Sequence, residues 1–309
     1  MVAITVSVPG KPTVNLDFAG KPPGQVTIKD VKIAIQAKFP QLVPNRQRIT
    51  FPSVDGASKP VPLTDESRSL ESYNVAEGSK LKLKDLGKQV GYRTLYLWEY
   101  VGPIFLNPLF LHLSTYLWGN YQYSALQLTI RNLIVIHFIK RFFESAFVHR
   151  FSRATVPLSY VIRNCLYYWG VCGLLIGLTL YRPAYSAASL KGSLLDNSTW
   201  ITIWTIGAEL LNLNTHLHLR SLRQPAGQPR KYPTGLGYGL VVCANYWFEL
   251  VGIVAMVIMT GGDLGTIVYL LIGGYFMKIW SDQKYARYKK EFDAKVFPGK
   301  RYRLFPPFY

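Results

Sequence analysis

The feature that most constrains the fold is a series of long apolar segments in the last two thirds of the chain. Six of them cover about 94–118, 123–139, 156–180, 199–213, 235–260 and 265–280. An α-helix needs roughly 20 apolar residues to cross a bilayer, and most of these segments approach or exceed that length. A soluble helical protein would need polar helix faces, which these segments lack. The sequence therefore predicts a polytopic α-helical membrane domain with about six transmembrane helices.

Charge follows the same division of the chain. Residues 1–86 carry 12 Lys/Arg and 8 Asp/Glu, and residues 87–309 carry 23 and 9. Basic stretches separate the apolar segments around 84–93, 140–153, 220–231 and 284–303. Because Lys and Arg are enriched in cytosolic loops of membrane proteins, we expect these stretches and both termini on the cytosolic side. A nucleic-acid partner is disfavoured, since the charges lie between apolar runs and form no single basic patch.

Residues 1–86 have the pattern of a small α/β domain. Alternating apolar residues predict strands over 2–8, 13–18, 47–51 and 79–84. Residues 27–39 have helical spacing, with Thr27 or Asp30 at the start and Pro40 after the end. This order, together with the stretch from Leu63 to Val75, resembles the ubiquitin-like fold. The chain continues past Gly87, so a conjugatable modifier is excluded.

Polar and charged side chains interrupt the apolar segments. They are Glu99, Arg131, His137, Arg163, Glu209, Asn212, Asn245, Tyr246 and Glu249. A charge at bilayer depth costs at least ~2.5–3.5 kcal/mol, so each requires a partner or a function. Any one of them could form an internal salt bridge, and Arg131 and Arg163 could reach an interface with their long side chains. As a set, they predict a polar cavity that opens toward the basic side and suits an anionic, phosphate-bearing ligand.

Metal and nucleotide motifs are missing from the sequence. His137, His216 and His218 are too few for a metal site without a suitably spaced Cys or carboxylate, and the last two fit a helix end near the membrane interface. The three cysteines form no CxxC pair, which favours a reducing compartment. No GxGxxG follows a strand and no P-loop occurs, so a dinucleotide would not be held by a Rossmann unit.

Several motifs spread along the chain resemble one family. They include Glu99-Tyr100-x-Gly102-Pro103, His137-x-x-Lys140-Arg141-x-x-Glu144 continuing to His149-Arg150-Phe151-Ser152, Asn164-Cys165-x-Tyr167-Tyr168-Trp169-Gly170, Asn212-x-x-x-His216-x-x-x-Arg220-x-x-Arg223, Asn245-Tyr246-x-x-Glu249 and Tyr288-x-Lys290-Glu291-Phe292. In order and spacing, they resemble the very-long-chain trans-2-enoyl-CoA reductases of the steroid 5-alpha-reductase superfamily. The resemblance covers essentially the whole chain, including the ubiquitin-like head.

The resemblance implies an enzyme of the endoplasmic reticulum membrane that uses NADPH to reduce long-chain trans-2-enoyl-CoA to saturated acyl-CoA. This is the last step of the very-long-chain fatty acid elongation cycle. Tyr246 matches the catalytic tyrosine, and a phenol with a pKa of ~10 keeps the proton that it must deliver. Glu99 and Lys140 match two further residues implicated in activity. At its depth Glu99 would have to be protonated or paired.

The resemblance also implies binding residues. Those expected for the cofactor are Asn212, His216, Arg220, Arg223, Lys231, Asn245, Lys284 and Tyr288. Those expected for the substrate are Gln89, Arg141, His149 and Glu249, and no metal is expected. Lys284 stands where the family often has His. For each cation, an ordinary charge in a cytosolic loop is the alternative interpretation.

Three other functions remain open at this point. The chain could reduce a steroid or polyprenol enone, it could be a non-catalytic membrane scaffold whose head recruits a partner, or it could resemble an isoprenylcysteine methyltransferase. The ubiquitin-like head and the stretch from Lys140 to Ser152 favour the enoyl-CoA reductase over the steroid enzyme. Expected partners are membrane lipids and, from the resemblance alone, other components of the elongation cycle.

Overall fold

The computed structural model describes residues 2–52, 60–151, 154–224, 228–229, 231–297 and 299–309. The chain divides into two compact units, residues 1–91 with 153–159, and residues 92–152 with 160–309. Ser152 of the second motif, and Arg153 and Arg230 of the basic loops, lie outside the described residues. The expected domains, 1–86 and 87–309, stay a prediction.

The first unit contains a five-stranded mixed sheet, which we call the head sheet. Its strands are β1 (Val2–Ser7), β2 (Val14–Phe18), β3 (Gln47–Phe51), β4 (Val61–Pro62) and β5 (Lys80–Asp85). Their order is β2-β1-β5-β3-β4, with β1 and β5 parallel and the other neighbours antiparallel. The strand positions expected from alternation are confirmed within one or two residues, whereas the two-residue β4 was not expected.

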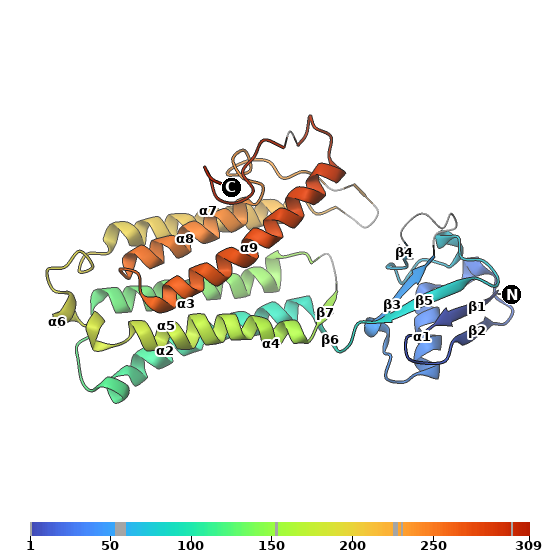
Figure 1. The fold of residues 1–309 in the computed structure, drawn as a ribbon, viewed down its shortest axis with the longest axis horizontal. Coiled ribbons are helices and arrows are strands. Elements are labelled where there is room, and N and C mark those ends of the chain that lie inside the picture. The colour runs from blue at the N-terminus through green and yellow to red at the C-terminus, as the bar shows by residue number, and fades with distance from the viewer. Residues whose placement is uncertain (1, 53–59, 152–153, 225–227, 230, 298) are drawn as a thin grey trace. The chain divides into compact units, whose positions relative to one another are not determined.

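Helix α1 (Ile28–Lys38) packs on one face of this sheet (Figure 1). Its start is fixed by a capping box, because the Asp30 amide donates to Thr27 Oγ1 at 3.2 Å and the Thr27 amide donates to Asp30 Oδ2 at 2.9 Å. Short 3₁₀ turns occupy Pro23–Gln25, Pro44–Arg46 and Glu71–Tyr73. This arrangement is the one that the ubiquitin-like resemblance predicted.

The core of the head is contained within its own residues. Alternate residues of the strands and the inner face of α1 form one buried cluster, whose members run from Val2 to Leu83. Ile4, Val6 and Ile35 are among its fully buried side chains. Because this cluster uses no residue outside 2–83, we expect the head to fold by itself. A separate pair, β6 (Gln89–Gly91) with β7 (Thr155–Pro157), completes the first unit.

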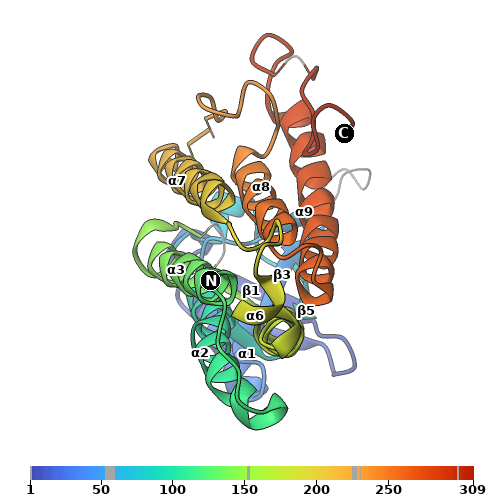
Figure 2. The ribbon, with the colours of Figure 1, turned by 90° about the vertical axis from the view of Figure 1, so that its left-hand side faces the viewer.

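The second unit is helical. Its elements are α2 (Tyr92–Trp118), α3 (Ala125–Phe143) with the π-helix η4 (Glu144–Val148), the continuous run α4 (Ser159–Cys165), π-helix η5 (Leu166–Leu175) and α5 (Ile176–Leu180), then α6 (Ala187–Leu190), α7 (Thr199–Ser221), α8 (Ala244–Met259) and α9 (Leu264–Glu291). Figures 1 and 2 show α8 between α7 and α9, and α2 packs between α3 and η5. Helix α9 also contacts η5, and α3 contacts α7, so the two groups of helices form one bundle.

Several helix boundaries differ from the sequence-based expectation. The segment 235–260 is helical only from Ala244, because Gly235 and Gly237 adopt φ values of +92° and +82°, outside the helical range. Residues 156–157 belong to β7, so the next helix begins at Ser159. Helices α7 and α9 instead extend beyond the expected apolar segments, which end at residues 213 and 280. In α9, ion pairs four residues apart, such as Lys278–Asp282, support the polar extension.

Two helical runs in the described part of the chain are long and apolar enough to cross a membrane, Ser159–Leu180 and Leu264–Glu291. A shorter apolar helix spans Ala244–Met259. Length and composition establish no more than this, so the expected six spans stay a prediction.

Candidate functional site

A cavity of about 330 Å³ lies within the helical unit. We call it the main cavity. Its lining comes from α2, α3, α4 with η5, α7, α8 and α9. Six of the expected site residues line it, namely Glu99, Arg141, His216, Asn245, Tyr246 and Glu249. The polar cavity that the sequence predicted is therefore present, and its volume is at the lower end of the ~300–1,000 Å³ typical of ligand sites.

Glu99 is buried where α2 meets α4. Asn164 Nδ2 donates a hydrogen bond of 2.7 Å to Glu99 Oε2. Helix α2 can approach the continuous run of α4 and η5 because it carries Gly102 at the contact with η5, where a Cβ would lie 2.1 Å from a ring carbon of Trp169. The Trp169 ring nitrogen in turn donates to the Trp98 carbonyl at 2.9 Å. The glycine of the first motif thus serves to place an amide beside the carboxyl group.

Arg141 connects α2, α3 and α7. Its guanidinium donates to the Tyr100 hydroxyl at 3.0 Å and to Glu144 Oε2 at 2.8 Å. His216 Nδ1 lies 3.0 Å from the same Glu144 oxygen. All of these groups are buried or nearly so. Glu144 thus holds both Arg141 and His216 at the cavity wall.

Glu144, His149 and His216 form a group whose ligand atoms all lie within 4.8 Å of one another. Such a group could hold a metal ion, but the Arg141 guanidinium already contacts Glu144 and would repel a cation. His149 follows the helix end, where burial and the charge of Arg141 lower the pKa of its imidazole to about 3. The absence of a metal site stays a prediction.

Tyr246 faces the main cavity from the first turn of α8. The Lys284 ammonium lies 4.9 Å from the centre of its ring, and the Trp280 ring centre lies 5.9 Å away. No side chain in the described structure forms a hydrogen bond with the Tyr246 hydroxyl. The phenol is therefore held by its ring, and its O–H is left available to a ligand.

Asn212 and Lys140 lie behind the wall that carries Asn245 and Glu249. Asn212 Nδ2 donates to the Asn245 carbonyl at 2.8 Å and to Glu249 Oε2 at 3.0 Å. Lys140 Nζ donates to Asn212 Oδ1 at 2.6 Å and pairs with Glu209 Oε2 at 2.7 Å. These two expected site residues therefore orient groups of the wall and do not themselves line the cavity.

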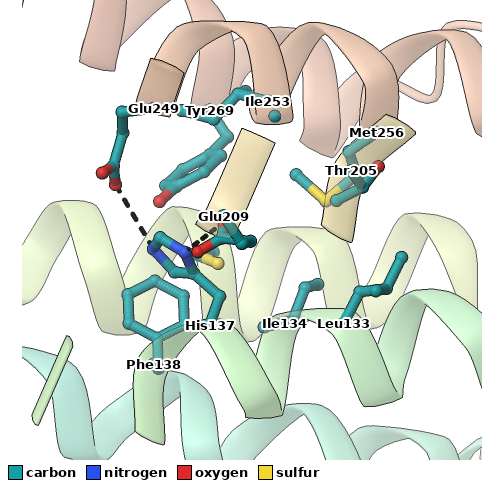
Figure 3. A pocket seen from close by; sticks show the side chains of 12 residues that line it. Leu133, Ile134, His137, Phe138, Thr205, Glu209, Glu249, Ile253, Met256 and Tyr269 are labelled. Atoms are coloured by element: carbon teal, nitrogen blue, oxygen red, sulfur yellow. Dashed lines mark hydrogen bonds and ion pairs between the residues drawn. The ribbon is translucent and has the colours of Figure 1, made fainter. Parts of the chain in front are cut away.

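His137 links two carboxylates in the same network. Its Nδ1 lies 2.7 Å from Glu209 Oε1, and its Nε2 lies 3.3 Å from Glu249 Oε1 (Figure 3). These contacts join α3, α7 and α8. A smaller cavity of about 40 Å³, lined mostly by apolar side chains, adjoins His137, Glu209 and Glu249. Glu249 borders both cavities.

One buried acceptor in the main cavity is unsatisfied. Asn245 Oδ1 has no hydrogen-bond partner among the described residues. A buried amide oxygen without a donor is costly, so it suggests a site for an external N–H group. The carboxamide of a nicotinamide presents such a group, and Asn offers both a donor and an acceptor to it. The residues present therefore fit a nicotinamide cofactor at this wall.

The other expected site residues are not among those that line the main cavity. Lys284 contacts it only through the Tyr246 ring. Arg220 donates to the Phe147 carbonyl at 2.9 Å, and Lys231 is exposed. Tyr288 is buried against Tyr232, Phe292 and Phe297, Arg223 follows the end of α7, and His149 stacks edge-on against His216.

Gln89 belongs to the first unit. Its side-chain amide donates to the carbonyls of Leu86 and Gly87 at 2.8 and 3.4 Å. These contacts are local and give no support for a role in substrate binding, which stays a prediction.

Some residues of the site were not selected from the sequence. Tyr100, Asn164 and Tyr168 line the main cavity, and Glu144 holds its arginine. All four lie inside the quoted motifs, so the motif membership was a usable signal. Glu209 was noted only as a polar residue at depth, and its pairing with His137 and Lys140 requires the tertiary structure.

Comparison with known proteins identifies the class of this fold and site. A family model described as 3-oxo-5-alpha-steroid 4-dehydrogenase matches residues 154–309. This span is about half of the chain. The chain belongs to the steroid 5-alpha-reductase family.

Within that class, the chain is similar to proteins named as enoyl-CoA reductases. It is 33% identical over 282 residues to the very-long-chain enoyl-CoA reductase of Dictyostelium discoideum, covering 91% of each chain. It is 30% identical over 298 residues to a Caenorhabditis elegans protein named "probable very-long-chain enoyl-CoA reductase", covering 92% of this chain and 91% of the relative. A human "trans-2,3-enoyl-CoA reductase-like" protein is 25% identical, with 87% and 74% covered.

Proposed function

We propose that this protein is an NADPH-dependent reductase that converts long-chain trans-2-enoyl-CoA to saturated acyl-CoA. The observation that carries the proposal is the meeting of Glu99, Tyr246 and the unsatisfied Asn245 amide in one cavity. The names of the relatives from Dictyostelium and Caenorhabditis support the substrate class.

The side chains of the cavity divide the chemistry among them. NADPH, when bound, supplies a hydride to the β-carbon of the enoyl thioester. Asn245 and Glu249 would hold the carboxamide end of the nicotinamide, and Asn212 and His137 fix both of them from behind. The Tyr246 phenol keeps its proton until the α-carbon needs it and then donates it.

Glu99 and the Tyr100–Arg141 pair act on the thioester carbonyl. Their O–H and N–H groups hold it in place while negative charge develops on its oxygen. For this role Glu99 must carry a proton or share one with a neighbour, and the Asn164 amide keeps its carboxyl group oriented. Lys284, Arg220, Arg223 and Lys231 provide positive charge for the phosphates of the cofactor and of CoA. Each of these assignments is testable by mutation.

We further propose that residues 87–309 cross the endoplasmic reticulum membrane with about six helices and that both termini are cytosolic. Large apolar side chains on the outside of the helices support this proposal. Phe105 is 68% exposed, Ile136 62% and Leu271 65%, on α2, α3 and α9 respectively. A soluble protein rarely leaves so many large apolar groups in water, whereas lipid would cover them.

The cellular role follows from the same chemistry. Reduction of a long-chain trans-2-enoyl-CoA completes one round of fatty acid elongation, and we propose that this is the step the protein catalyses. The enzymes that supply its substrate, a synthase, a ketoreductase and a dehydratase, are then its expected partners.

The test is Tyr246→Phe in the purified protein. We expect turnover to fall by about 10²–10⁴-fold, the usual contribution of a general acid, while NADPH binding is retained. Turnover is measured as enoyl-CoA-dependent loss of NADPH, and binding by fluorescence titration. Tyr275→Phe is the matched control, because Tyr275 is 62% exposed on α9. Wild-type turnover in the Tyr246 variant would refute the proton-donor role.

Reduction of a steroid or polyprenol enone is the second candidate, and the description of the matching family model favours it. Both substrates present a carbonyl conjugated to a C=C bond, so the same residues could act on either. Competing a long-chain enoyl-CoA with a 3-oxo-4-ene steroid in one assay separates them. We expect only the thioester to be consumed. If NADPH does not bind at all, a non-catalytic scaffold would replace both candidates.

A further inference from the structure

The head sheet has one face that α1 leaves uncovered. We call it the open face. Residues facing one another across neighbouring strands share a face, and the register aligns Thr5 with Lys80, Thr50 with Lys82, and Arg48 with Lys84. These positions alternate with the buried core residues of the same strands. The open face therefore presents Arg48, Lys80, Lys82 and Lys84 side by side.

These four cations are exposed and form no ion pair with any residue in the described part of the chain. Arg48 and Lys84 are directly opposite each other on β3 and β5. Like charges at opposed positions destabilise a sheet, so this arrangement is unfavourable for the isolated head. Asp17, on the edge strand β2, is the acidic side chain that shares the face, and Glu77 near one end accepts from the Ala3 amide at 2.9 Å.

Charge elsewhere in the head is nearly balanced. Residues 1–86 contain 12 Lys/Arg and 8 Asp/Glu, so removing the four cations and Asp17 leaves 8 and 7. The excess positive charge of the head is therefore concentrated on the open face. A solvated surface with no function would not need this asymmetry.

The rest of the open face lacks the groups that anchor a protein partner. Its other positions are small or polar, with Ala3, Thr5, Ser7, Asn15 and Thr50 on the longer strands and Pro62 at the edge. Protein interfaces depend on buried aromatic and large apolar anchors, which these positions do not provide. The face thus fits a partner that is recognised by negative charge alone and spread over a flat area.

We propose that the open face of the head sheet binds the anionic phosphate headgroups of a lipid bilayer. The inference rests on the proposed membrane location of residues 87–309, which makes a bilayer the accessible polyanion, because β5 ends at Asp85 and the helical unit starts at Tyr92. With so short a connection to apolar helices, the head remains at high effective concentration near a membrane surface. Anionic membrane surfaces also attract clusters of several cations.

The experiment uses the head fragment 1–86, whose core is complete, and two kinds of vesicle. One contains phosphatidylcholine alone, and the other contains phosphatidylcholine with phosphatidylserine. We expect the fragment to sediment with the anionic vesicles only and to be released by salt. Neutralising three cations as K80Q/K82Q/K84Q should weaken binding by about 100-fold, since each basic residue near such a surface contributes ~1 kcal/mol, or about fivefold.

The control variant K21Q/K29Q/K38Q removes the same charge from exposed positions outside the open face and should keep most of the binding. Circular dichroism confirms that both variants are folded. Equal losses in the two variants, or no binding to anionic vesicles, would overturn the proposal. It would also be overturned if free CoA, used as a soluble polyanion, bound the same three lysines more tightly than the vesicles do.

Discussion

The cavity residues act in pairs, and each functional group is oriented by a second side chain. Asn164 orients Glu99, Tyr100 and Glu144 orient Arg141, and Asn212 orients Glu249. Tyr246 and Asn245 differ from these groups. The Tyr246 hydroxyl and Asn245 Oδ1 have no partner among the described residues, and the phenol is held by its ring. An unpaired hydroxyl fits the proton-donor role proposed for Tyr246, and an unpaired amide oxygen fits the carboxamide contact proposed for Asn245.

Replacing Asn164 with Leu should reduce kcat/KM by about tenfold or more. Removal of one partner of a buried polar group costs about 1–3 kcal/mol, and ~1.4 kcal/mol is tenfold. NADPH affinity should change little, since Asn164 contacts Glu99 and not the Asn245 wall. Steady-state kinetics with long-chain enoyl-CoA tests this expectation.

Asn132→Leu is the control for that variant, because Asn132 is exposed and its side-chain bond in the described structure is the one it accepts from its neighbour Arg131. If the Asn164 variant is as active as the control, Asn164 has no role in orienting Glu99.

At the scale of helices, the central feature is the network that joins α3, α7 and α8 through His137. Two carboxylates, Glu209 and Glu249, face the same imidazole (Figure 3). Lys140 is the other cation that pairs with Glu209. The network thus joins α3, α7 and α8, and α8 carries Asn245 and Glu249 at the main cavity. Its positive and negative charges balance only while all of its members are present.

His137→Leu should lower the thermal midpoint and weaken NADPH binding. Breaking a buried ion pair by removing one partner typically costs about 3–5 kcal/mol, because the remaining charge is left unpaired. Adding Glu209→Gln to the same variant should restore part of the lost stability, since it removes one of the two stranded carboxylates. The measurement is thermal unfolding in detergent, with and without NADPH.

The matched control is His112→Leu, at an exposed position on α2. An unchanged midpoint in the His137 variant, or no recovery in the double variant, would show that the network is not holding the helices.

Element boundaries show what sequence patterns can and cannot predict. The start of α1 was predictable because its capping box is local, from Thr27 to Asp30. The start of α8 was not, since the apolar run before Ala244 contains Gly235 and Gly237, whose conformation a hydropathy average ignores. The ends of α7 and α9 were not predicted because both helices continue into polar residues, where a hydropathy average no longer indicates a membrane helix.

At the scale of the whole molecule, the site is built from segments distant in sequence. Six of the residues selected from the motifs line the main cavity, but the sequence alone could not separate lining residues from those behind the wall. Lys140 and Asn212 carry the same polar character as Asn245. Only the packing of the helices shows that Asn212 donates to the Asn245 carbonyl and that Lys140 donates to Asn212. Whether the tail cations contact a bound phosphate likewise depends on where the ligand lies, which their spacing in the sequence does not indicate.

The head should unfold in acid independently of the helical unit. Three of its carboxyl groups have pKa values below the usual 3.8, since Asp30 accepts bonds from Thr27, Asp65 accepts them from Ser67, and Asp85 accepts two from Arg46. A depressed folded pKa contributes stability that is present above the unfolded value and is lost as the pH falls below it. The urea midpoint of fragment 1–86 should therefore decrease between about pH 5 and about pH 2.

Arg46→Gln, which removes the donor to Asp85, should make that decrease smaller. A urea midpoint that stays constant or rises over the same pH range would contradict the assigned roles of the three carboxyl groups.

We propose above that hydride and proton reach a trans-2-enoyl thioester in the main cavity. The most direct test is a single reaction of the purified protein with a long-chain trans-2-enoyl-CoA and NADPH deuterated at the reduced carbon of the nicotinamide, with the product analysed by mass spectrometry. We expect saturated acyl-CoA with one deuterium at the β-carbon and a solvent-derived hydrogen at the α-carbon. Unchanged substrate, or deuterium found anywhere other than the β-carbon, would contradict it.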